Sequence, residues 1–156
     1  MLRINKDSIR NIIFGVEDSL VSTIGVVFGI ATATQDPKTT LTSGIIVVAV
    51  EAISMGAGSY LSEQSTDEYA GKKEHSDNPV MDGVLMAISY GVSGVLVLLP
   101  YMLLPIDIAK YVSIGATTAA LFLLGYIPNK SIKSAIRMAV VAGVAILAGF
   151  LIASLI

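Results

Sequence analysis

Three acidic side chains, Glu17, Asp18 and Glu51, lie inside stretches of sequence that are otherwise apolar enough to cross a membrane. A charged side chain at the centre of a bilayer costs roughly 2.5 to 3.5 kcal/mol on insertion scales. Such residues therefore seldom face lipid, and instead face a partner helix, a water-filled path or a bound cation. Glu17 has a second interpretation, in which it points toward the membrane interface and pairs with Arg10 or Lys6.

Two of these carboxylates are expected at the same membrane depth as residues of another helix. Counted from the cytoplasmic ends of the two helices at about 1.5 Å per residue, Asp18 and Met55 both lie about 12 Å into the membrane. Ser22 and Glu51 both lie about 18 Å in, just past the middle of a hydrocarbon core about 30 Å thick. The sequence therefore predicts two antiparallel helices that line one polar track.

Carboxylate and thioether groups on this track indicate a divalent metal as the cargo. Carboxylate oxygens suit most divalent cations, whereas a thioether favours softer transition metals. We predict Asp18, Met55 and Glu51 as metal contacts, with Fe²⁺ as the first candidate, Mn²⁺ as the second, and Co²⁺ or Zn²⁺ as further alternatives. A metal must displace any proton that such a carboxyl carries, so Glu51 and Glu17 are also candidates for proton coupling. Met55 could instead fill a packing gap, which is the common role of methionine in apolar interiors.

The elements that must position these residues are membrane helices within one domain of residues 1–156. Hydropathy predicts an all-α integral membrane protein, because the long unbroken apolar runs exclude the alternating strands of a β-barrel. The five predicted helices are about 11–34, 42–62, 82–104, 108–127 and 136–155.

Composition narrows the functional class. The chain is 54% hydrophobic and only 14% charged, with a net charge of −2, and no basic nucleic-acid surface is indicated. It has no cysteine and a single histidine, which excludes thiolate and histidine-based zinc sites. An HExxH motif is also absent, so we predict that the protein is not an enzyme and has no resident cofactor.

Lysine and arginine are distributed unevenly between the two sides of the predicted helices. Eight of the ten lie on the side of the N-terminus, and two, Lys38 and Lys110, lie on the other. The eight are Arg3, Lys6, Arg10, Lys72, Lys73, Lys130, Lys133 and Arg137. Because positively charged loops stay in the cytoplasm, the N-terminus is expected there and the C-terminus outside the cell or in a lumen.

Residues 63–80 form the longest polar segment and are predicted to be a cytoplasmic loop into which the second helix frays. An alternative is that the loop collects cations for the membrane site, with Glu63, Asp67 and Glu68 as a metal entrance. Glu74, His75 and Asp77 belong to the same segment.

Small residues recur one helical turn apart on both acidic helices. They are Gly25 and Gly29 on the first helix, and Ser54, Gly58 and Ser62 on the second. This spacing allows helices to approach closely in lipid. We therefore predict a homodimer with the first helix against its copy, which would bring two sets of ligands to one axis.

Several strings resemble the vacuolar iron transporter family. They are GVEDSLVSTIGVVFGIA (15–31), EAISMGAGSYLSEQSTDEY (51–69), GVLVLLPYMLLP (94–105) and LGYIPNKSIKSAIR (124–137). The resemblance implies a dimer of five-helix subunits that exports Fe²⁺, in some members Mn²⁺, from the cytoplasm in exchange for protons. It also implies a path at the dimer interface, with metal-contacting Asp and Met residues that match Asp18 and Met55 here.

The chain departs from that family at three places. Segment 63–80 is too short for the helical cytosolic metal-binding domain of plant-type members. Val47 stands where members carry a glutamate, and Glu51 lies one turn nearer to Met55. Glu17 and Ser19 flank Asp18 where a neutral residue and glycine are usual. A competing hypothesis from another class is a non-transporting membrane scaffold or metal sensor whose partner binds the 63–80 loop.

Overall fold

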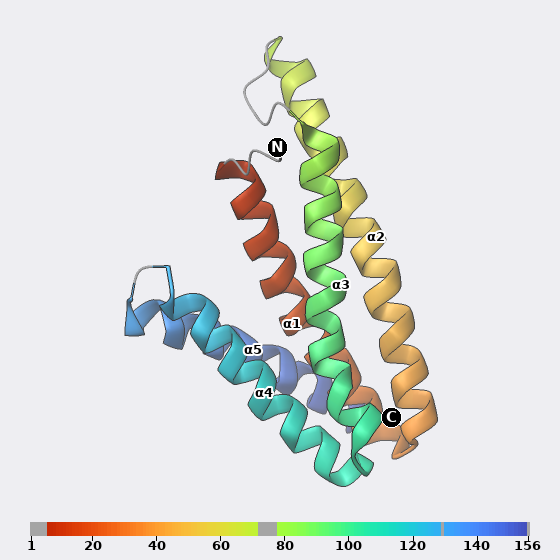
Figure 1. The fold of residues 1–156 in the computed structure, drawn as a ribbon. Helices are drawn as coiled ribbons and strands as arrows, with labels where there is room; N and C mark the ends of the chain where they lie inside the picture. The colour runs from red at the N-terminus through yellow and green to blue at the C-terminus, as the bar shows by residue number, and fades with distance from the viewer. Residues whose placement is uncertain (1–5, 72–77, 129, 156) are drawn as a thin grey trace.

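The computed structural model describes residues 6–71, 78–128 and 130–155, which form five α-helices (Figure 1). They are α1 (Lys6–Thr34), α2 (Pro37–Ala70), α3 (Pro79–Leu103), α4 (Ile106–Tyr126) and α5 (Ile132–Ala153). No strand occurs within these ranges, and all five helices are long and apolar enough to cross a membrane. The predicted all-α class and the five membrane helices are therefore confirmed.

The helix boundaries differ most from the prediction at the end of α2. This helix continues to Ala70, so the first part of the expected 63–80 loop is helical. Hydropathy marks where a helix leaves the membrane, whereas a helix ends at a backbone signal. That signal is Gly71, which takes a left-handed φ of 66° and donates its N–H to the Glu68 carbonyl. Lys72, Lys73, Glu74, His75 and Asp77 lie outside the described residues, as does Arg3.

Polar side chains define where three of the helices begin. Asp36, Asn78 and Ser131 are the N-caps of α2, α3 and α5, and each accepts a hydrogen bond from a backbone N–H three residues later. Such caps satisfy donors that have no partner within the helix. Asp36 lies in the exposed connection between α1 and α2. Hydrogen bonds from the Thr39 side chain and backbone lower the pKa of its carboxyl.

The helix α1 is the central element, since it packs against each of the other four. On one side α2 and α3 lie alongside each other, and on the other side α4 pairs with α5 (Figure 1). The start of α1, the end of α2 and the start of α3 lie at the same end of the bundle (Figure 1). Both acidic helices thus have neighbours within the chain that can supply polar partners.

Close contact between α1 and α5 depends on glycine. A Cβ atom on Gly25 would lie 2.9 Å from the Ala145 carbonyl oxygen, and one on Gly29 would lie 2.9 Å from that of Gly149. We expected these two glycines to bring α1 against its copy in a dimer. That expectation is wrong for the glycines, because they bring α5 of the same chain into contact instead.

Replacing Gly149 with leucine should lower the melting temperature. A Cβ atom there would collide with the Gly25 backbone oxygen, and overpacking typically costs about 1 to 3 kcal/mol. The matched control is Gly143→Leu on the same helix, where an added Cβ atom meets nothing within 4 Å. Thermal unfolding of the two purified variants in detergent tests this, and equal losses of stability would contradict the glycine contact.

Candidate functional site

A polar cluster around Glu51 joins α1, α2 and α3 in the middle of the bundle. The Ser22 hydroxyl donates to Glu51 Oε2 at 2.9 Å, and the Tyr90 hydroxyl donates to the same oxygen. The Ser22 and Tyr90 hydroxyl oxygens are themselves 2.6 Å apart. Ser19 fixes this part of α3 by donating to the Tyr90 carbonyl oxygen at 2.7 Å. The predicted common depth of Ser22 and Glu51 is therefore confirmed.

The chemistry available to this cluster is proton exchange or metal contact. Tyr90 is fully buried, and among the described residues no cationic side chain forms an ion pair with Glu51. Hydroxyl groups can both donate and accept, so Ser22 and Tyr90 hold the carboxylate when it is charged and remain compatible with its protonated form. The described side-chain partners of Glu51 are thus two hydroxyl groups, one on α1 and one on α3.

Asp18 lies one helical turn before Ser22 on α1 and is half-buried. No hydrogen bond or ion pair joins its carboxylate to another side chain in the described ranges. Met55 lines a pocket that Asp18 does not line. The pairing of Asp18 with Met55 on one metal therefore stays a prediction, and in the described part of a single chain no three His, Asp or Glu residues gather as a metal site.

A pocket of about 610 Å³ lies between α1, α2 and α3, toward the end where α1 begins. Its lining includes Asn11, Met55, Ser59, Glu63 and Met86. Asn11 donates from Nδ2 to Glu63 Oε1 at 3.1 Å. Glu63 was expected in an exposed loop, and this is wrong because it faces the interior of the bundle with only 4% of its surface exposed.

The remaining acidic candidates occupy more open positions. Asp67 is half-buried and Glu68 exposed on the last turns of α2, where Gln64 donates to the Glu68 carboxylate at 3.2 Å. Glu17 is half-buried. In the structure as described it forms no ion pair with Arg10 or Lys6, so its proposed surface pairing is not observed.

The family model described as the VIT family matches residues 9–76 and 65–154, and so spans all five helices. The chain belongs to the VIT family. Its two matched parts overlap at residues 65–76, which include the last turns of α2 and most of the connection between α2 and α3.

Curated relatives of this VIT-family chain carry iron transport in their names. It is 26% identical to vacuolar iron transporter 1 of Oryza sativa subsp. japonica, over 91% of this chain and 82% of the relative. It is 27% identical to vacuolar iron transporter 1 of Arabidopsis thaliana, over 95% of this chain and 86% of the relative. The second alignment runs over 214 residues, more than the 156 of this chain, so the relative carries extra residues within the aligned region.

Sequence reasoning missed the contribution of α3 to this VIT-family site. Asp82, Met86 and Tyr90 are all buried and follow one another at four-residue intervals. This spacing places them on one face of the helix, and the structure turns that face toward α1 and α2. The spacing was visible in the sequence, but the strong apolar signal of this helix concealed it.

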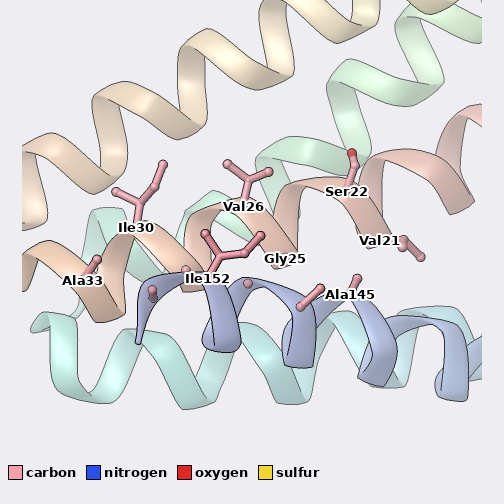
Figure 2. A pocket seen from close by; sticks show the side chains of 12 residues that line it. Val21, Ser22, Gly25, Val26, Ile30, Ala33, Ala145 and Ile152 are labelled. Atoms are coloured by element: carbon pink, nitrogen blue, oxygen red, sulfur yellow. The ribbon is translucent and has the colours of Figure 1, made fainter. Parts of the chain in front are cut away.

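A second, apolar pocket of about 440 Å³ lies between α1 and α5. Figure 2 shows Ser22, Val26 and Ile30 projecting from one side of α1 beside this pocket. Asp18 precedes Ser22 by one turn and therefore continues the same stripe. The Val26 side chain is 38% exposed, so this stripe is not fully covered within one chain.

Proposed function

We propose that this VIT-family protein is a proton-coupled transporter that exports Fe²⁺ from the cytoplasm across a membrane. The observation that carries the proposal is the family match over all five membrane helices, including both acidic ones. The named relatives support iron as the cargo, with Mn²⁺, Co²⁺ and Zn²⁺ as alternatives. Five helices long and apolar enough to cross a membrane, together with relatives named as transporters, support a transporter rather than an enzyme.

Asp18 and Met55 are proposed to contact the metal, and Glu51 to couple its movement to protons or to contact it a second time. Asp18 is half-buried and has no hydrogen-bond or ion-pair partner among the described residues. This supports the proposal, because a carboxylate in a membrane helix needs a cation, a proton or a partner. The hydroxyl contacts of Glu51 with Ser22 and Tyr90 support proton exchange there. Glu17 is the second candidate for the proton-coupling residue.

A homodimer is proposed to complete the path. The α1 stripe that contains Asp18 and Ser22 is only partly covered, and the α1–α5 pocket beside it is apolar. A second copy on this stripe would bring two Asp18 carboxylates to one symmetry axis. The path would then run along the interface between the copies, starting from the cytoplasmic end where Asp67 and Glu68 form the metal entrance.

Metal flux in reconstituted liposomes tests the proposed function. Liposomes with an acidic interior should take up external Fe²⁺, kept reduced with ascorbate, and their interior should become less acidic as metal enters. A protonophore should remove the stimulation. Metal binding without flux would contradict transport and would support the scaffold or sensor hypothesis.

A further inference from the structure

Two buried carboxyl groups, of Glu63 and Asp82, contact residues near the start of α1. Glu63 of α2 is 4% exposed and Asp82 of α3 is 1% exposed. The Ser8 hydroxyl donates to Asp82 Oδ1 at 2.5 Å, and Asn11 Nδ2 donates to Glu63 Oε1 at 3.1 Å. Ser8 and Asn11 are three residues apart, which is close to one turn of α1. The two carboxyl groups are therefore held against the same short stretch of this helix.

The second oxygen of each carboxyl group is buried without a partner. Neither Glu63 Oε2 nor Asp82 Oδ2 accepts a hydrogen bond from any described residue. Burying a charged oxygen without a compensating contact is strongly unfavourable, and buried charges are normally paired or bound to metal. Two such oxygens at one place are therefore available to contact a ligand.

The charge around this pair favours a cation. The described charged side chains that act on Glu63 are Asp82, Asp7 and Arg10. Three carboxyl groups therefore face one guanidinium group, and Arg10 is exposed and forms no ion pair with Glu63 in the described ranges. The excess negative charge would attract a divalent ion.

The pocket between α1, α2 and α3 gives a small ion access to Glu63. Glu63 lines this pocket together with the thioethers of Met55 and Met86, and Asp82 lies one turn before Met86 on α3. Directly beside Asp82, α2 and α3 touch, since a Cβ atom on Gly56 would lie 2.7 Å from the Gly83 carbonyl oxygen. This contact encloses Asp82 on the side of α2, and Asp82 is almost fully buried.

We propose that Glu63 and Asp82 form a binding site for a divalent transition-metal ion, distinct from the metal contact proposed at Asp18. Carboxylate oxygens together with a neighbouring thioether suit Mn²⁺ or Fe²⁺ better than Mg²⁺. The site belongs to three helices of one chain, so it does not depend on the proposed dimer or on transport.

Counting Mn²⁺ bound to the purified full-length chain by electron paramagnetic resonance tests this site. The double variant E63Q/D82N should lose one bound Mn²⁺ per chain, whereas D18N should keep that ion. D107N is a matched control, because its carboxylate is 82% exposed at the other end of the bundle, and it should bind as wild type does. An unchanged Mn²⁺ count in the double variant, or loss of this ion in D18N, would overturn the proposal.

A second measurement covers the case in which the double variant does not fold. Crystals of the wild-type protein soaked in Mn²⁺ should show anomalous density within bonding distance of both Glu63 and Asp82. Saturating metal with no such density would overturn the site. If the density is present and liposomes show no flux, the site stands and the proposed transport function fails, so the two proposals can be judged separately.

Discussion

Replacing Asp18 with asparagine should abolish Fe²⁺ uptake into liposomes while leaving the protein folded. Asparagine has nearly the same shape, but it cannot carry the negative charge that a metal ligand supplies. Loss of an outer-sphere partner alone typically reduces metal affinity about 10- to 100-fold, so loss of a direct ligand should reduce flux at least as much. Folding should be preserved, since the Asp18 carboxylate forms no hydrogen bond or ion pair with any described residue.

The matched control for this prediction is Asp107→Asn, which makes the same chemical change at a largely exposed position. Its flux should equal that of the wild type. Equal thermal unfolding of both variants would show that the effect is on transport rather than stability. Undiminished uptake by Asp18→Asn would remove Asp18 from the transport path and would leave the Glu51 cluster as the candidate metal contact.

The fold could be predicted from the sequence because its main signal is local. Long apolar runs require helices in a membrane, where every backbone hydrogen bond must be formed within the segment. The helix ends were less accurate, since hydropathy does not detect a glycine such as Gly71 that stops a helix beyond the membrane. The common depth of Ser22 and Glu51 followed from helix rise alone and agrees with their hydrogen bond.

The part of the site that could not be predicted depends on which helices are neighbours. Asp82 and Tyr90 become functional candidates only because α3 packs beside both α1 and α2. The same information decides that Gly25 and Gly29 contact α5 of their own chain rather than a second copy. Small-residue spacing predicts close packing, but it does not specify the partner helix.

The connection between α2 and α3 is short. It runs from Gly71 to Asn78, and the alignments with relatives contain more residues than this chain has. The family match is divided into two parts near this connection. The sequence predicts that this segment is too short to hold the cytosolic metal-binding domain of plant-type members. Glu63 and Asp82, proposed above as a metal site, lie on the two helices that this connection joins.

Replacing Glu51 with glutamine should make Fe²⁺ flux independent of the pH gradient while metal binding at Asp18 survives. Glutamine keeps the size of the side chain and can still accept hydrogen bonds from Ser22 and Tyr90, but it cannot gain or lose a proton. Stimulation by an acidic interior should therefore disappear. The measurement compares initial uptake rates with and without the gradient, alongside Fe²⁺ binding to the purified variant.

Two further variants separate the role of Glu51 from that of its surroundings. Tyr90→Phe removes one donor to the carboxylate, a loss of about 1.5 to 3 kcal/mol for a bond to a charged group, and should slow gradient-driven flux about tenfold or more while keeping its pH dependence. Tyr111→Phe is its control, because Tyr111 is 72% exposed.

The comparison of Glu51→Gln with Glu17→Gln tests which carboxyl group couples flux to protons. If Glu51→Gln kept the full pH dependence of flux and Glu17→Gln lost it, proton coupling would be assigned to Glu17 instead of Glu51. The contrast is informative because Glu51 has hydroxyl partners on two other helices, whereas Glu17, which itself lies on α1, has none within the described structure. Of the two carboxyl groups, only Glu51 therefore contacts α3 directly.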